Sequence, residues 1–181
     1  MQRNVLSLAL FAAGCAAPTP LTPARPGLIT TQSASYRAVV SPTSVRITVV
    51  AKFTNTTSDK LTLHPCSQHP PYPLAVSLQR YESESGEWRT VLSPVCTLML
   101  MLNPPRLSRG ETRTDTVRLE GFRTAHWYPN FPPGPVAGVY RLVYSSIFRS
   151  WNADHNGPPV GTLGELVPDS LLVSNSFRVK E

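Results

Sequence analysis

The 181-residue sequence predicts an all-β domain built as an antiparallel sandwich. Proline accounts for 19 of the residues, which disfavours a helix bundle because proline breaks helix interiors. Short segments in which apolar and polar residues alternate recur along the chain, and turn residues separate them. No segment has the apolar spacing of a long amphipathic helix, so short strands account for the apolar pattern.

The first 14 residues predict an export signal. Arg3 gives a positive start, and residues 5–13 form an apolar stretch that is too short for a stable membrane-spanning helix. The stretch ends in Ala12-Ala13-Gly14-Cys15, which resembles the lipobox of bacterial lipoproteins, although alanine stands where leucine is usual. The resemblance implies that Cys15 becomes the first residue of the mature chain and carries the lipid. The alternative is an ordinary secretory signal, cleaved slightly further on, that discards Cys15.

Residues 15–33 predict a tether between this signal and the folded domain. They contain four prolines and no periodic apolar pattern (Pro18, Pro20, Pro23 and Pro26). Such a composition is typical of an extended, semi-rigid linker. The folded domain is therefore expected over residues 34–181, held off a membrane surface.

Strand patterns begin at residue 36. The clearest strand is 45–54, because its odd-numbered residues from Val45 to Phe53 are all apolar and share one face. Further strands are predicted at 36–40, 61–64, 74–81, 87–92, 96–102, 111–119, 139–147 and 171–179. Two long loops, 121–136 and 149–169, interrupt the pattern, and loops of this length are usually functional or mobile. The predicted core is Val45, Ile47, Val49, Phe53, Leu74, Val76, Leu78, Leu142 and Phe177.

Three of these segments resemble bacterial immunoglobulin-like domains. Residues 45–59 resemble their second strand and turn, 138–142 their penultimate strand, which often opens Gly-x-Tyr, and 174–179 their closing strand. The resemblance covers residues 34–181 and implies an immunoglobulin-like β-sandwich of about 8–9 strands. It also suggests that the Tyr140 hydroxyl bonds nearby backbone, as a corner tyrosine does; the alternative is a plain core aromatic. Trp88 lies on a hairpin return and is not equated with the core tryptophan of antibody domains.

Cys66 and Cys96 predict a disulfide, because they are an even pair in an exported chain once Cys15 carries the lipid. The bridge closes a loop of about 30 residues, worth roughly 3–4 kcal/mol in the chain-entropy model. Neither cysteine lies on the strands that carry the antibody-type bridge. A copper-type metal site is the alternative, since imidazole and soft sulfur lie nearby (His64, His69, Met99 and Met101).

The charge pattern excludes several functions. Charged residues make up 15% of the chain, the formal net charge is +6, and no basic run of five or more occurs, so no nucleic-acid partner is expected. Outside the cytoplasm, a mild basic excess spread along the chain has anionic lipid or cell-wall polymer as its partner, or has no partner at all. The sequence contains no Gly-x-Ser-x-Gly, His-Glu-x-x-His or phosphate-loop motif, so it predicts neither an enzyme nor a cofactor.

The first long loop is the candidate binding site. It places aromatic rings among prolines (His126, Trp127, Tyr128 and Phe131), and rigid rings supply contact area at low entropic cost. The alternative is that the rings cover an open end of the sandwich.

Together these features predict a cell-envelope lipoprotein with a non-enzymatic binding or structural module. Its expected partners are the membrane, through the N-terminal lipid, and an envelope protein or cell-wall polymer. The alternatives are an envelope metal-binding protein, and a protease inhibitor, since the strand pattern loosely resembles the bacterial intracellular proteinase inhibitors.

Overall fold

The computed structural model describes residues 28–66, 73–93, 96, 104–123, 130–149, 151–152 and 162–181. Within these ranges the chain forms thirteen strands, and its single helical element is one 3-10 turn, Asp169–Leu171. The predicted all-β sandwich is therefore confirmed.

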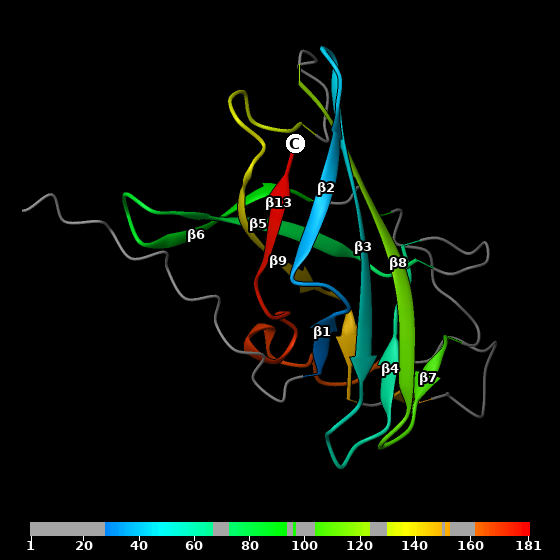
Figure 1. Ribbon diagram of the computed structural model, residues 1–181. Coiled ribbons are helices and arrows are strands. Elements are labelled where there is room, and N and C mark those ends of the chain that lie inside the picture. The colour runs from blue at the N-terminus through cyan, green and yellow to red at the C-terminus, as the bar shows by residue number, and fades with distance from the viewer. Residues whose placement is uncertain are drawn as a thin grey trace, which may run out of the picture.

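The first sheet is built around the two longest strands. β3 (Ser44–Thr54) and β8 (Thr112–Phe122) pair antiparallel along their whole length, and Figure 1 shows them side by side. β1 (Ile29–Thr31) pairs with the end of β3, opposite residues 51–53.

The second sheet has the order β6–β5–β9–β13, and all its neighbours are antiparallel. Its members are β5 (Val76–Glu82), β6 (Glu87–Leu92), β9 (Gly138–Tyr144) and β13 (Phe177–Lys180). Figure 1 shows the β5–β6 hairpin extending sideways, away from β3 and β8.

β2 (Ser35–Val40) joins the two sheets. Its first half pairs parallel with β13, and its second half pairs antiparallel with β3. One sheet thus holds β1, β3 and β8, and the other holds the β6–β5–β9–β13 series, so the two sheets form a β-sandwich.

Smaller strands close one end of the sandwich. β4 (Leu61–Leu63) lies between β7 (Arg106–Leu107) and β10 (Ile147–Phe148). β11 (Trp151–Asn152) pairs with β12 (Thr162–Leu163) inside the second predicted loop.

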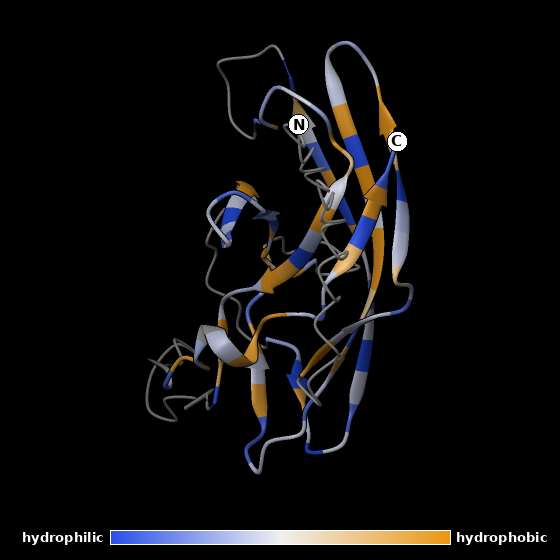
Figure 2. Ribbon diagram, turned by 60° about the vertical axis from the view of Figure 1, so that its left-hand side comes forward, coloured by the Kyte–Doolittle hydropathy of each residue, from blue (hydrophilic) through white to orange (hydrophobic). Residues whose placement is uncertain are grey.

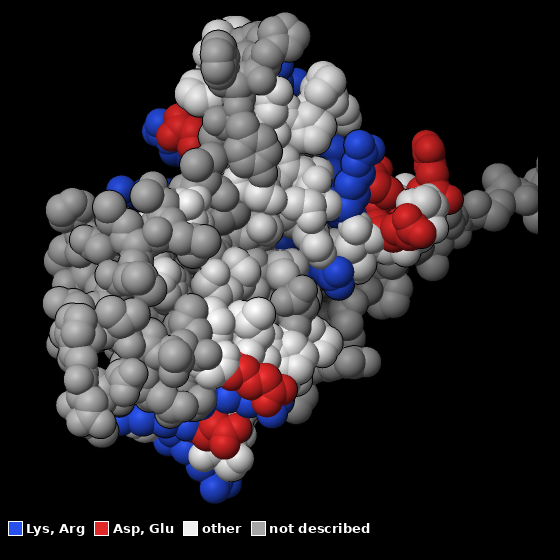
Figure 3. All heavy atoms as spheres, turned by 180° about the vertical axis from the view of Figure 1, so that it is seen from behind, with Lys and Arg blue, Asp and Glu red and all other residues white. Residues whose placement is uncertain are grey.

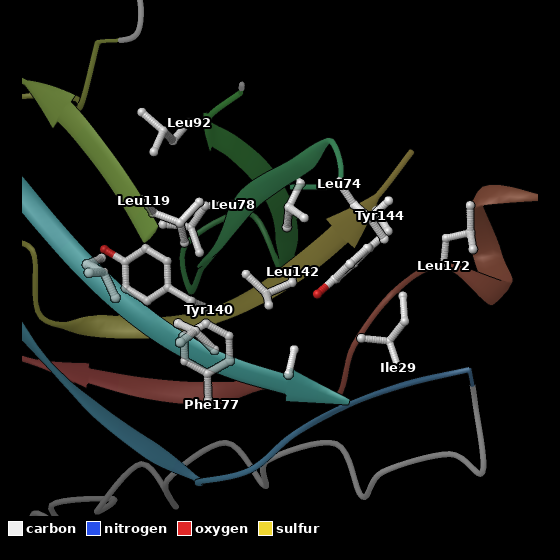
Figure 4. Packing of buried hydrophobic residues seen from close by; sticks show 14 of the residues in the cluster. Ile29, Leu74, Leu78, Leu92, Leu119, Tyr140, Leu142, Tyr144, Leu172 and Phe177 are labelled. Atoms are coloured by element: carbon white, nitrogen blue, oxygen red, sulfur yellow. The ribbon is translucent and has the colours of Figure 1, made fainter. Parts of the chain in front are cut away.

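The core lies between the sheets, and all nine predicted core residues are buried. These residues are buried because hydrophobic and hydrophilic residues alternate along the strands. Figure 2 shows this alternation, including in the strand that runs to the C-terminus. Inside the sandwich the rings of Tyr140 and Phe177 stack 6.4 Å apart (Figure 4). Phe53 and Tyr144 stack in the same way at 6.2 Å.

The structure corrects the predicted domain boundary. Residues 15–33 are not a tether throughout, because Ile29–Thr31 is a strand and Leu28 and Ile29 are core residues. The Thr31 amide also donates a 2.7 Å hydrogen bond to Oδ1 of Asn175. The apolar run Leu28-Ile29 is too short to show periodicity, so the pattern alone did not reveal it.

The predicted strand 171–179 is correct only from Phe177. Leu171 belongs to the 3-10 turn, where its amide bonds the carbonyl of Pro168. Ser174 then satisfies backbone groups with its side chain, since Oγ accepts from the Leu142 amide and donates to the Asn175 carbonyl. Such local bonds compete with a regular strand ladder. Of the predicted strand 96–102, only Cys96 lies within the described residues.

Tyr140 is a corner tyrosine, as the resemblance suggests. Its fully buried hydroxyl donates a 2.6 Å hydrogen bond to the carbonyl of Val136, four residues upstream. Burial raises the pKa of Tyr140 to about 12, with Arg80 opposing the shift and Glu82 adding to it. The hydroxyl therefore holds the connection that leads into β9.

We expect Tyr140→Phe to destabilise the fold by about 1–3 kcal/mol, because it leaves a buried carbonyl without its donor. Tyr144→Phe is the matched control on the same face of β9, since within the described residues the buried Tyr144 hydroxyl has no hydrogen-bond partner. Urea denaturation of both variants checks this. The wild-type advantage should be constant below pH 10 and fall between pH 10 and about 12, because the tyrosine of the unfolded chain ionises near pH 10 while burial keeps Tyr140 of the folded chain protonated up to about pH 12. Equal stability losses in the two variants would contradict the assignment.

Candidate functional site

A cleft of about 780 Å³ runs along β8. One wall consists of eight consecutive residues, 113–120, so that side chains of both faces and the backbone between them line it. The opposite wall comes from the other sheet and from the chain around the disulfide (Cys66, Pro73, Leu74, Val76, Leu92 and Ser93). The cleft therefore lies where the edge of one sheet faces the side of the other.

The β8 wall is a strand edge. Among the described residues β8 pairs with β3 on one side, and its other partner is a single bridge at its last residue, between Phe122 and Asn130. An edge strand offers a row of amides and carbonyls that a further strand can pair with. The apolar residues Leu74, Val76 and Leu92 give the opposite wall its hydrophobic character.

Two charged residues of β8 face inwards. Arg113 and Asp115 alternate with outward threonines and share a face with Val117 and Leu119. The Arg113 Nε donates to Oδ1 of Asp115 over 2.6 Å, and the two side chains are 19% and 14% exposed. Burying such a pair costs desolvation, so the pair alone is not an argument for stability.

The second oxygen of Asp115 is a vacant acceptor. Oδ2 is buried, and the described residues offer it no hydrogen-bond partner. A buried carboxylate oxygen needs a donor, and in an open cleft either water or a ligand group supplies it. The cleft thus combines a backbone edge, an apolar wall and one oriented acceptor.

Tyr144 lies near this pair, on β9. Burial raises the pKa of its hydroxyl far above the usual range, and the negative charge of Asp115 adds to the effect while Arg113 opposes it. Tyr144 therefore stays protonated and offers a hydroxyl close to the charged pair.

Cys66 and Cys96 form the predicted disulfide, with their Cα atoms 4.6 Å apart. Cys66 follows β4 and Cys96 follows β6, so neither lies on β3 or β9, the strands that correspond to the antibody-type bridge. Because Cys66 also lines the cleft, the bridge fixes part of the cleft wall.

The predicted binding loop is only partly described. Residues 124–129, which hold His126, Trp127 and Tyr128, lie outside the described residues. Phe131 is 3% exposed and packs against Gly121, where an added Cβ would lie 3.1 Å from Phe131 Cβ. Its amide also bonds the Phe122 carbonyl. Phe131 is therefore a core residue, which agrees with the alternative that its ring covers the sandwich, and a binding role for the rest of the loop stays a prediction.

Of the four residues of the alternative metal site, only His64 lies within the described residues. His64 is buried with its Nδ1 unbonded, and its amide bonds the carbonyl of Ser146. His69, Met99 and Met101 lie outside the described residues, as does Cys15. In the described part of the chain no three histidine, cysteine, aspartate or glutamate residues gather as a metal site.

Sequence reasoning missed Arg113 and Asp115. A usable signal was present, because period-two alternation along 113–119 assigns these charges to the same face as Val117 and Leu119. Charged residues on an apolar strand face indicate either a buried ion pair or a lined cavity.

A scan against protein-family models finds no match, and a search of the curated proteins finds no similar sequence. Among the helical segments of the described residues, none has the length and hydrophobicity of a transmembrane span.

Proposed function

We propose that the protein is an exported, lipid-anchored cell-envelope protein whose sandwich domain is a non-enzymatic binding module. The export signal that ends at Cys15 supports the anchor. The disulfide supports an oxidising compartment, because such bridges are rare in the cytoplasm.

The cleft along β8 is the observation that carries the binding proposal. Its length of eight residues and its strand-edge wall suit an extended polypeptide segment, which would add to the sheet through main-chain hydrogen bonds. Every second side chain of that segment packs against the apolar wall. Asp115 Oδ2 accepts from a donor side chain, such as lysine, serine or threonine, at one position of the ligand.

Site-specific photo-crosslinking in intact cells tests this proposal. A benzophenone amino acid at Ser93, in the cleft, should give crosslinked bands that protease treatment removes. The same probe at Thr48, exposed on the outer face of β3, serves as the control. Val117→Trp narrows the cleft and should abolish the Ser93 bands, while circular dichroism checks that this variant folds. Bands that persist in this variant, or that occur equally from Thr48, would contradict the proposal.

A further inference from the structure

The outer face of the second sheet carries one sign of charge. Strand alternation places Arg37 of β2, Arg178 and Lys180 of β13 and Arg141 of β9 on this face, because Tyr36, Phe177 and Tyr140 of the same strands pack into the core. The acidic residues of β5 and β6, Glu82 and Glu87, alternate onto the opposite face. By contrast, the view from behind in Figure 3 shows small mixed groups of acidic and basic side chains at the periphery.

Arg141 is the organised member of this set. Its guanidinium lies 4.3 Å from the centroid of the Trp88 ring, and its Nε donates to Oε1 of Gln79 over 2.8 Å. Gln79 in turn donates to Oγ1 of Thr90. These contacts with Trp88 of β6 and Gln79 of β5 fix the Arg141 side chain across three strands.

None of the described carboxylates forms an ion pair with Arg141 or Arg178. A fixed guanidinium of this kind matches the paired oxygens of a phosphate or carboxylate. Burial lowers the pKa of Arg141, but arginine remains charged at physiological pH.

Two aromatic residues complete the face. Tyr81 and Trp88 are directly opposite each other on β5 and β6, with ring centroids 5.4 Å apart, and both are half-buried. Tyrosine and tryptophan favour the boundary between lipid headgroups and acyl chains. Five strands at the usual spacing give a face about 20 Å wide.

We propose that this basic-aromatic face, defined by Arg37, Tyr81, Trp88, Arg141, Arg178 and Lys180, docks onto an anionic lipid surface. The inference rests on the proposed lipid anchor, which would hold the domain beside a membrane. Phosphate groups of the lipids pair with the arginines, and Tyr81 and Trp88 contact the headgroup layer. The docking leaves the β8 cleft, on the other sheet, open to its ligand.

Vesicle sedimentation tests this docking with the Cys15→Ser protein, which carries no lipid. We expect it to bind vesicles of phosphatidylcholine with roughly 30% phosphatidylglycerol, and to bind pure phosphatidylcholine far more weakly. About 1 M NaCl should release it, because the Debye length is then about 3 Å. Arg141→Gln and Arg178→Gln should each weaken binding about fivefold, as expected for one basic residue near such a surface.

Arg109→Gln is the matched control, because this substitution also removes one positive charge. Arg109 is exposed in the turn before β8, outside the basic-aromatic face. An equal loss in the control, or equal binding to neutral vesicles, would overturn the proposal. So would binding to soluble polyphosphate without binding to vesicles. Because the assay uses unlipidated protein, its failure is distinct from a failure of the lipid anchor, which is measured by labelling of Cys15.

Discussion

Ile47→Asp should unfold the domain. Ile47 is 1% exposed in the middle of β3, where it lies between Ala38 of β2 and Leu119 of β8, both buried. An unpaired buried carboxylate costs several kcal/mol, and domains of this kind have a total stability of only about 5–15 kcal/mol. Far-ultraviolet circular dichroism and limited proteolysis would show the loss of the β fold.

Thr48→Asp is the control for this variant. Thr48 is the next residue along β3, but it is exposed and pairs with Arg118 on the outer face. Surface substitutions usually change stability by less than about 0.5 kcal/mol, and an opposite charge directly across the strands is mildly favourable. If Ile47→Asp melted at the wild-type temperature, the assignment of the core face would be wrong.

Cys15→Ser should move the protein from the membrane fraction to the soluble exported fraction. Each methylene buried by an acyl chain contributes about 0.8 kcal/mol to anchoring, and serine cannot carry the thioether-linked lipid. Metabolic labelling with a fatty-acid probe should mark the wild type and leave the variant unmarked. Membranes should be washed in high salt first, so that any electrostatic docking is removed.

Cys66→Ser is the appropriate comparison, because it removes a cysteine of the disulfide and should keep both the label and the membrane location. Labelling of the Cys15→Ser protein at the wild-type level would refute the lipoprotein proposal. In that case the alternative of an ordinary secretory signal would remain.

The fold could be predicted where apolar and polar residues alternate over a long strand. The sequence of β3 places five apolar residues on one face, and the structure buries all five. The prediction failed where pairing depends on distant partners. Ile29–Thr31 is a strand because the end of β3 pairs with it, and no feature of those three residues reveals this.

The candidate site was harder to predict, for a related reason. The cleft is formed by residues far apart in the sequence, such as Cys66, Leu92 and Asp115, and only the packing of two sheets brings them together. The aromatic loop was predicted as a site because its composition is unusual. The sequence of β8, by contrast, has the composition of an ordinary polar strand. Composition identified Phe131 as a possible contact, but its burial depends on the space above Gly121.

The position of β2 between the sheets has a consequence for how the chain folds. The Thr31 amide bonds Asn175, 144 positions away, and β2 gains its second neighbour only when β13 is present. Contacts of such long sequence separation form slowly, because the loop-closure entropy is lost before they contribute. In a chain that emerges with its N-terminus first, the earliest strands therefore stay incomplete until the last strand is available. During that interval the edges of β2 and β9 are open to other chains. A chaperone that pairs with exposed strand edges would bind the chain at this stage, and truncation before residue 177 should leave an aggregation-prone species.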